Sequence, residues 1–496
     1  MTVGFQNMPS RIVQLQRQAV QLMMAGQVIA AIQAFRDLIA MRSAPFADDW
    51  FNLAYLLRCD RQFEAALDHY DRALALGING PEEVHLNRAA IMSEHLHRQD
   101  AAIIALRAAL NHNPTFLPAL LNLATIYEDC GRAEEARTAY RHVLTLDPLN
   151  GRAHGRLTAI DLHQGLADAA LERLNATMSS KHVRQEDRAE LHFAAGLALD
   201  ALQRFDEAFT HFDQGNRLAR RRIDPALAYD RTAMDTLVDA LIDGYPISGT
   251  GTTTLLRPQD GNPAPIFICG LFRSGSTLAE RLIGRHRLIT AGGEHETIPA
   301  IVDRLVPYPQ SAVVLSSDQT KALGVQYRQE LDAAFPNAGI ITDKRPDNFL
   351  HIGLIKQIFP DAKFVHTHRH QLDNILSIYF LYFADGVSYG FDLDDIVHYL
   401  GCHDRLMRHW RALFGNDIVE LDYDALVRDP ETVMRSVLTE LDLPWEADCA
   451  HTANDQDAVK TASSWHVRKP LNDRSSGRWR NYAAHLADVR TKLGLA

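Results

Sequence analysis

A loop suited to binding a phosphate group lies at residues 270–277. It reads GLFRSGST, follows the apolar run PIFICGL, which predicts a buried strand, and precedes TLAERLIGRH, which predicts an amphipathic helix. In this order, backbone N–H groups and the helix N-terminus face an anion. Gly270 and Gly275 have the spacing of the ATP or GTP loop G-x4-G-K-[ST], but Ser276 replaces its lysine and Arg273 lies inside the loop. We therefore expect a site for a 5′-phosphate without a triphosphate tail and its Mg²⁺.

A second pair of anion-binding residues follows about 100 residues later. Arg369 ends the strand predicted from KFVHTHR, and Ser377 lies eight residues further on in the helix predicted from DNILSIYF. Because the helix runs back along its strand, the two side chains can meet over one phosphate. This spacing is a weak signal alone, and its place at the next expected strand-to-helix turn strengthens it.

The two motifs together resemble those of the PAPS-dependent sulfotransferases, which use 3′-phosphoadenosine 5′-phosphosulfate (PAPS). The resemblance implies that the loop Arg273-Ser274-Gly275-Ser276-Thr277 holds the 5′-phosphosulfate and that Arg369 and Ser377 hold the 3′-phosphate. The closer similarity is to the branch with the tyrosylprotein sulfotransferases and the bacterial TPR-linked sulfotransferases. It covers about 265–482 and departs from the family pattern within this range, in the acceptor-contacting stretch 300–335.

Further site residues are implied by this resemblance. The catalytic glutamate of the branch falls on Glu294, and the catalytic lysine, in a K-x-P context, falls on Lys344. A serine that contacts the transferring group falls on Ser463, the adenine-side tyrosine on Tyr423, and a phosphate-binding basic residue on Arg478. We also expect Arg468 and Lys469 near the 3′-phosphate, although an exposed basic pair explains them as well.

The chemistry implied is the in-line transfer of a sulfuryl group between two oxygens, without a metal ion. Arg273 and Lys344 would stabilise developing negative charge, and Ser463 would donate a hydrogen bond to the bridging oxygen. Glu294 is the expected general base for the acceptor hydroxyl. His295 and Glu296 lie next to it and stay open as rival bases. The products would be a sulfate ester and adenosine 3′,5′-bisphosphate.

The elements that precede this site form a repeat array. Pro114 and Pro148 lie 34 residues apart, and the segment between them resembles the tetratricopeptide repeat (TPR), a helix–turn–helix unit. A small residue followed by a bulky one recurs at Ala31/Phe35, Ala66/Tyr70, Ala102/Leu106, Ala136/Tyr140, Ala170/Leu174 and Ala208/Phe212. Small residues let paired helices approach closely, so a helical superhelix is expected.

We therefore predict an all-α TPR superhelix at 1–243, a Gly/Pro/Thr-rich linker at 244–264, and an α/β P-loop-like sulfotransferase domain with a mostly parallel sheet at 265–496. Helices at 392–414 and 424–442 should pack on the sheet. The ligand should lie at the carboxyl ends of the strands.

Composition excludes several classes of protein. The 51 Lys and Arg against 62 Asp and Glu give a net charge of −11, which argues against a nucleic-acid coat or a polybasic membrane binder. No membrane span or signal peptide is recognisable, and the five scattered cysteines suit a reducing compartment, so a cytoplasmic protein is expected. The histidines, including His366, His368 and His370, show no zinc motif, and no metal site is predicted.

Two other functions compete with sulfuryl transfer. One is a P-loop kinase or NTPase, in which Asp343 at the end of GIITD would hold Mg²⁺. The other is a non-catalytic TPR interaction protein with a relic nucleotide fold. The acceptor is left open: the closest pattern suggests a peptide tyrosine, which the TPR groove could present, and a carbohydrate, lipid or small phenol is an alternative. The sequence does not indicate the oligomeric state.

Overall fold

The computed structural model describes residues 8–44, 46–96, 98–247, 263–336, 338–383, 387–451 and 475–495. Internal contacts divide the chain into two compact units, one up to Ala153 and the other from His154 onward. Most of the predicted linker 244–264 falls on residues 248–262, which lie outside the described residues.

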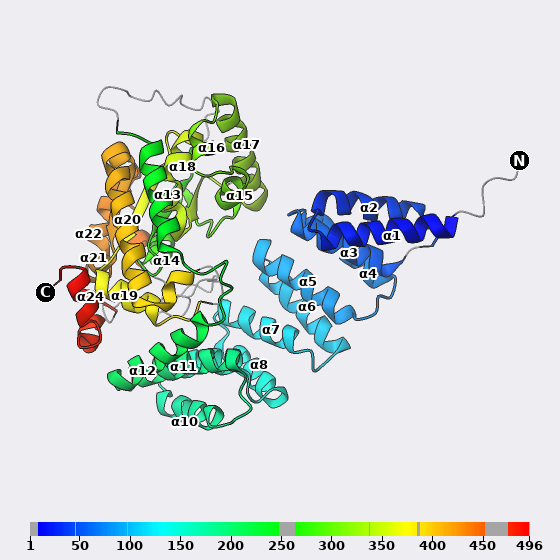
Figure 1. The fold of residues 1–496 in the computed structure, drawn as a ribbon, viewed down its shortest axis with the longest axis horizontal. Helices are drawn as coiled ribbons and strands as arrows, with labels where there is room; N and C mark the ends of the chain where they lie inside the picture. The colour runs from blue at the N-terminus through cyan, green and yellow to red at the C-terminus, as the bar shows by residue number, and fades with distance from the viewer. Residues whose placement is uncertain are drawn as a thin grey trace, which may run out of the picture. The chain divides into compact units, whose positions relative to one another are not determined.

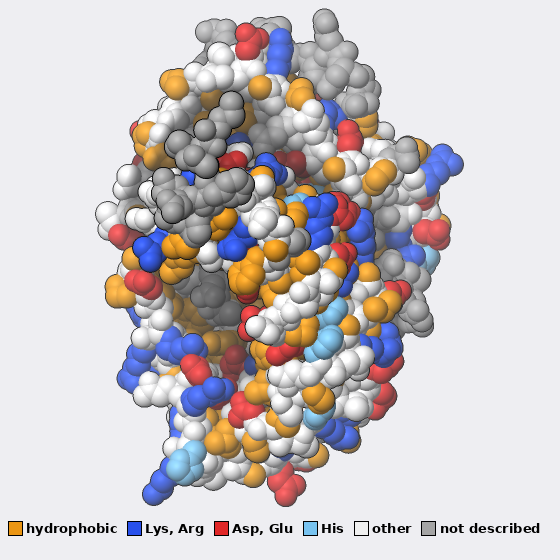
Figure 2. Space-filling view, turned by 90° about the vertical axis from the view of Figure 1, so that its right-hand side faces the viewer, with side chains coloured by type: hydrophobic (Ala, Val, Ile, Leu, Met, Phe, Trp, Pro, Cys, Tyr) orange, Lys and Arg blue, Asp and Glu red, His pale blue; other side chains and the backbone are white. Residues whose placement is uncertain are grey.

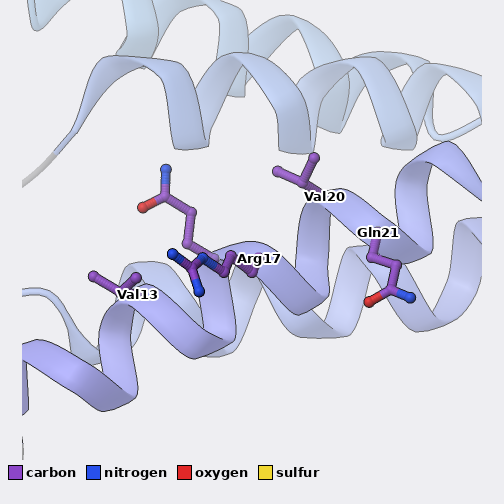
Figure 3. Close-up of a pocket in the computed structure, with 5 residues that line it drawn as sticks. Val13, Arg17, Val20 and Gln21 are labelled. Atoms are coloured by element: carbon purple, nitrogen blue, oxygen red, sulfur yellow. The ribbon is translucent and has the colours of Figure 1, made fainter.

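The first unit consists of antiparallel helix pairs joined by short turns (Figure 1). Its elements are α1 (Met8–Met24), α2 (Val28–Met41), α3 (Ala47–Cys59), α4 (Phe63–Ala75), α5 (Pro81–Ala90), the π-helical turn η1 (Ile91–His95), α6 (Gln99–His112), α7 (Leu117–Asp129) and α8 (Ala133–Leu146). A shallow pocket on α1 is lined by Val13, Gln16, Arg17, Val20 and Gln21, and shares no residue with the predicted site (Figure 3).

Helix pairs continue into the second unit. They are α9 (Gly151–His163), α10 (Ala167–Met178), α11 (Gln185–Ala201), α12 (Phe205–Arg220) and the single helix α13 (Arg231–Gly244). All six predicted small-and-bulky pairs lie on the second helix of a pair, and each of their side chains is fully buried. The predicted TPR-like helical region is therefore confirmed, and close packing at these alanines is its cause.

A parallel sheet follows. Its strands are β1 (Ile266–Gly270), β2 (Ile289–Thr290), β3 (Ile340–Lys344), β4 (Lys363–His368) and β5 (Ile418–Asp422), in the order β2-β3-β1-β4-β5. β1 pairs with β3 on one side and with β4 on the other. The chain thus winds in both directions from β1, and the carboxyl ends of β1 and β4 border the crevice where such sheets bind ligands.

Helices cover both faces of this sheet. The remaining helical elements of this unit are α14 (Ser276–Ile283), α15 (Thr297–Arg304), α16 (Gln310–Val313), α17 (Ser317–Ala334), η2 (Pro346–His351), α18 (Ile352–Ile358), α19 (Gln371–Tyr379), η3 (Ser388–Phe391), α20 (Leu393–Phe414), η4 (Gly415–Asp417), α21 (Tyr423–Arg428), α22 (Pro430–Glu440), η5 (Ala447–Ala450), η6 (Arg478–Tyr482) and α24 (Ala487–Lys492).

Alternation along β1 shows how the two faces are used. Ile266 and Ile268 pack with α14 and α22, whereas the Phe267 ring faces Tyr327 of α17 and Phe359 after α18. The helix predicted at 392–414 is present as α20. The prediction of one helix at 424–442 is wrong: the chain forms α21 and α22, because Pro430 cannot donate a backbone hydrogen bond and instead starts a new helix capped by Asp429.

An aromatic seam joins α12 to the sheet-bearing part of the second unit. Phe212 stacks on Phe380, with ring centroids 3.9 Å apart, and Phe209 packs against Tyr379 and His485. The Asn216 amide donates to the Tyr379 carbonyl over 2.9 Å. Phe193 of α11 packs against Tyr382, with ring centroids 5.4 Å apart. The helices α11 and α12 therefore share a core with the elements that carry the site.

The surface is mixed in charge. On the face that Figure 2 shows, lysine and arginine side chains lie among aspartate and glutamate side chains. Within the described ranges, none of the helices combines the length and the apolar character needed to span a bilayer.

Candidate active site

Two glycines shape the loop between β1 and α14. Gly270 has φ +147°, and a Cβ there would lie 2.3 Å from the Thr367 carbonyl oxygen of β4. Gly275, the residue before α14, has φ +106°, and a Cβ there would lie 2.5 Å from the Tyr423 ring. Both positions need glycine for the conformation and for close approach. The loop is thus pressed against β4 on one side and Tyr423 on the other.

Ser274 braces this loop from within. Its buried hydroxyl donates to the Leu271 carbonyl over 2.6 Å and lies 2.7 Å from the Thr367 hydroxyl. Ser276 and Thr277 begin α14, where the first N–H groups of a helix face outward. The Ser274 hydroxyl thus fixes the loop, and the first backbone N–H groups of α14 are those that a helix offers to an anion.

The structure brings the two predicted anion-binding motifs together. The Arg273 Nε donates to the Ser377 hydroxyl of α19 over 3.0 Å, across 104 positions of sequence. Arg369, which follows β4, lies with its guanidinium 4.8 Å from the centre of the Tyr423 ring. One cluster at the carboxyl ends of β1 and β4 therefore contains Arg273, Ser377, Arg369 and Tyr423.

The cluster has the chemistry to hold anions. Burial and the nearby positive charges of Arg369 and Arg478 lower the pKa of Arg273 to about 10. The Arg369 Nε is buried and has no hydrogen-bond partner among the described residues, while its Nη2 donates to the Ser475 carbonyl over 2.7 Å. Several partly desolvated guanidinium groups in one place are stabilised by bound phosphate. The residues present thus fit a nucleotide with more than one phosphate group.

Arg478 reaches the cluster from a segment held by a buried carboxylate. Asp373 of α19 accepts hydrogen bonds from the backbone N–H groups of Gly477 (2.6 Å) and Trp479 (2.8 Å). Arg478 itself forms an ion pair with Asp200 of α11, over 2.8 Å. The predicted phosphate-binding residue is therefore also a link between the repeat helices and the sheet-bearing part of the unit.

A lysine and a glutamate meet at the end of β3. The Lys344 side chain is almost fully buried, and its Nζ donates to Glu294 Oε1. The Glu294 side chain is 45% exposed, so its carboxylate is open to a substrate. The Lys344 backbone N–H donates to the Gly293 carbonyl over 2.8 Å, which holds the glutamate loop on the strand.

Glu280 of α14 holds the same loop in place by hydrogen bonds. Its Oε1 accepts from the Gly293 N–H over 2.9 Å and from the Thr342 hydroxyl over 2.8 Å. Burial raises the pKa of this carboxyl group. Glu280 is a charged residue among the mostly apolar buried side chains of α14, which is the feature of the sequence that could have indicated this role.

The two rival bases occupy different settings. Glu296 forms a 2.6 Å ion pair with Arg345, and the His295 ring packs edge-on against Phe335 with centroids 5.8 Å apart. Both are therefore engaged with groups other than Lys344. Of the three neighbours, Glu294 is the one placed against the buried lysine.

Asp343 points away from the phosphate loop. It follows Thr342, which bonds α14, and precedes Lys344, so alternation along β3 puts its side chain on the opposite face. There it accepts from the Tyr327 hydroxyl over 2.6 Å and from the Asn348 amide over 3.3 Å. Burial raises its pKa to about 7. This orientation disfavours the interpretation of Asp343 as a Mg²⁺ ligand beside the loop.

Ser463, Arg468 and Lys469 lie outside the described residues. His366 is buried and lies 2.7 Å from Glu420 and 3.1 Å from His403, so hydrogen bonding explains it. Sequence reasoning missed Asp200 and Asp373, because their partners lie more than 100 positions away.

Comparison with known proteins agrees with this geometry. Residues 265–447 match the model of the sulfotransferase family, and residues 117–148 match that of the tetratricopeptide repeat. The resemblance to a TPR-linked sulfotransferase, predicted from the motifs, is thereby confirmed for these two segments.

Individual relatives are more distant. An uncharacterised protein of Aquifex aeolicus is 29% identical over 428 residues, which are 82% of this chain and 54% of that protein. Protein-tyrosine sulfotransferase A of Caenorhabditis elegans is 24% identical over 217 residues, 40% of this chain and 56% of that protein. The chain spans about half the length of the curated relatives it matches. The solved sulfotransferase domain of the Synechococcus PCC 7002 olefin synthase is 18% identical, with a TM-score of 0.34, and covers 45% of this chain and 90% of that one.

Proposed function

We propose that this chain, whose residues 265–447 match the sulfotransferase family, moves a sulfuryl group from PAPS to a hydroxyl acceptor. The observation that carries the proposal is the meeting of Arg273, Ser377 and Arg369 at the ends of β1 and β4, beside the Lys344–Glu294 pair. The phosphate-binding groups and the Lys344–Glu294 ion pair thus lie along one edge of the sheet.

Some of these residues would bind the nucleotide, and others would take part in the transfer of the sulfuryl group. Arg369 and Ser377 bind the 3′-phosphate, and Arg273 with the first N–H groups of α14 binds the 5′-phosphosulfate. Tyr423 packs beside the adenine. Arg478, with Arg468 and Lys469, adds positive charge. Lys344 stabilises negative charge on the oxygen that leaves sulfur, and Ser463 donates a hydrogen bond to it.

Glu294 acts as the general base. The buried ammonium of Lys344 holds one oxygen of its carboxylate in place, and the exposure of the side chain leaves the group open to the acceptor. It takes the hydroxyl proton while the acceptor oxygen bonds to sulfur and the bond to the phosphate oxygen breaks. No metal ion takes part.

We propose a peptide tyrosine as acceptor. The support is the similarity to proteins named protein-tyrosine sulfotransferase and the presence of repeats of a kind that binds extended peptides. If tyrosine peptides are not modified, the acceptor would be a carbohydrate, a lipid or a small phenol. The few scattered cysteines support a cytoplasmic location.

Sulfuryl transfer is tested with labelled PAPS and pools of peptides, glycans and phenols. Glu294→Ala should lower the rate by about 10²–10⁴-fold, as expected for loss of a general base. The matched control is Glu296→Ala, which removes a neighbouring carboxylate and should keep most of the activity. Equal losses in both variants would refute the assignment of the base.

Nucleotide binding is tested separately from catalysis. Adenosine 3′,5′-bisphosphate should bind without Mg²⁺ and more tightly than adenosine 5′-monophosphate, because only the bisphosphate carries the 3′-phosphate. Arg369→Ala should remove this difference between the two nucleotides. Tighter binding of ATP that requires Mg²⁺ would favour the kinase or NTPase instead. Tight bisphosphate binding without transfer to any pool would favour the non-catalytic protein.

A further inference from the structure

Three side chains capable of binding a metal meet between α13 and α20, which lie side by side (Figure 1). His398 and Cys402 are one helical turn apart on α20 and so share one side of it. Asp235 faces them from α13. The cluster uses none of the residues assigned to sulfuryl transfer.

The distances within the cluster suit tetrahedral coordination. Asp235 Oδ2 lies 3.2 Å from His398 Nε2, Asp235 Oδ1 lies 3.4 Å from Cys402 Sγ, and the sulfur lies 4.0 Å from His398 Nε2. Zinc bonds of about 2.0–2.3 Å at tetrahedral angles separate such ligand atoms by about 3.4–3.6 Å. One ligand atom from each of the three residues lies within 4.8 Å of the other two, so rotation of the side chains would bring all three onto one ion.

The surroundings hold the ligands in position. His398 Nδ1 lies 2.8 Å from the Tyr229 hydroxyl, which fixes the ring with Nε2 towards Asp235. The nearby cation, Arg405, forms a 2.7 Å ion pair with Asp239, one turn further along α13. That pairing directs its positive charge to a different carboxylate. Such support of a histidine by its second nitrogen is typical of metal sites.

The three candidate ligands differ in how far they are exposed to solvent. The Cys402 side chain is buried, whereas about half of the Asp235 side chain is exposed. A bound ion would thus be anchored from the protein side and open to a water molecule on the other. Three protein ligands and one water match the coordination number of zinc.

We propose that Asp235, His398 and Cys402 form a Zn²⁺ site that clips α13 to α20. The mixed sulfur, nitrogen and oxygen set favours Zn²⁺ over Mg²⁺ or Ca²⁺, which take oxygen ligands. Since α13 joins the repeat helices to the chain that leads into β1, the clip would fasten this connection. The site is independent of sulfuryl transfer, and either proposal can fail without the other.

The test uses the full chain stripped of metal with a chelator and then titrated with Co²⁺ or Zn²⁺ alone. Co²⁺ should produce a near-ultraviolet thiolate-to-cobalt absorption band at one ion per chain, and Zn²⁺ should displace it. Cys402→Ser should abolish the band and weaken Zn²⁺ binding at least tenfold. Asp235→Asn and His398→Gln should also weaken binding at least tenfold. Circular dichroism verifies that each variant is folded.

The matched control is Cys59→Ser, which removes an exposed cysteine in the first unit. It should leave both the band and the affinity unchanged. The proposal is overturned if the unaltered chain gives no thiolate band, if the band persists in folded Cys402→Ser, or if Cys59→Ser removes it.

Discussion

Replacement of Asp343 by asparagine should change how stability depends on pH. The carboxylate is fully buried in β3, where burial raises its pKa from 3.8 to about 7, against the opposing effects of Tyr327, Arg345 and Asn348. Because the folded state holds this proton more tightly than the unfolded chain, the stabilisation is complete below about pH 4 and is lost as the pH rises through 7.

The magnitude follows from the shift. About three pKa units correspond to about 4 kcal/mol over the whole titration, of which about 2.5 kcal/mol falls between pH 5 and pH 8. The amide introduced by Asp343→Asn would not titrate. Its oxygen can still accept from Tyr327. Once the Asn348 amide turns over, its NH₂ can donate to Asn348 Oδ1, which is buried without a partner in the described part of the chain.

The assay is urea unfolding at pH 5 and pH 8, followed by tryptophan fluorescence, since Trp410 is buried and donates to the Phe349 carbonyl. Relative to the original chain, Asp343→Asn should gain about 2.5 kcal/mol in the free energy of unfolding on going from pH 5 to pH 8. A stability difference that is the same at both pH values would refute the reasoning. The variant should also keep its transferase activity, whereas a Mg²⁺ ligand at this position would lose it.

Three further substitutions test the site and the fold. Gly275→Ala forces a Cβ to 2.5 Å from the Tyr423 ring, so bisphosphate affinity should fall at least about tenfold by calorimetry, while Gly401→Ala, with open space around it, should leave affinity unchanged. Asp373→Ala removes the acceptor of two backbone N–H groups, and limited proteolysis should then cleave near residue 477 faster than in the original chain. Phe212→Ala should destabilise the second unit by about 3–5 kcal/mol, measured by urea unfolding; a change below about 1 kcal/mol would contradict the role of the aromatic seam.

Local sequence patterns were enough to predict much of the fold. The six small-and-bulky pairs mark close helix packing because a small side chain has the same effect in every repeat. The strands around Phe267 and Val365 are visible because a buried parallel strand is apolar on both faces. The prediction of one helix at 424–442 was wrong although the sequence contains its cause: Pro430 ends one helix and begins the next.

Some contacts of the candidate site could be predicted from the order of the strands, and others could not. The contact between Arg273 and Ser377 could be expected because each motif ends a strand of one parallel sheet. The orientation of Asp343 could not, since it depends on the register of β3 with β1. The pairing of Arg478 with Asp200, and of Asp235 with His398 and Cys402, depends on how helices distant in sequence pack, which leaves no local pattern.

The seam around Phe212 and Phe380 has a practical consequence for work with shortened forms of the chain. A fragment trimmed to begin at β1 would leave Phe380 and Tyr482 facing water, and such newly bared aromatic surface promotes aggregation. The helices α11 and α12 therefore behave as part of the interior of the second unit rather than as a detachable accessory. Truncations and domain transplants should retain the chain from at least the start of α11.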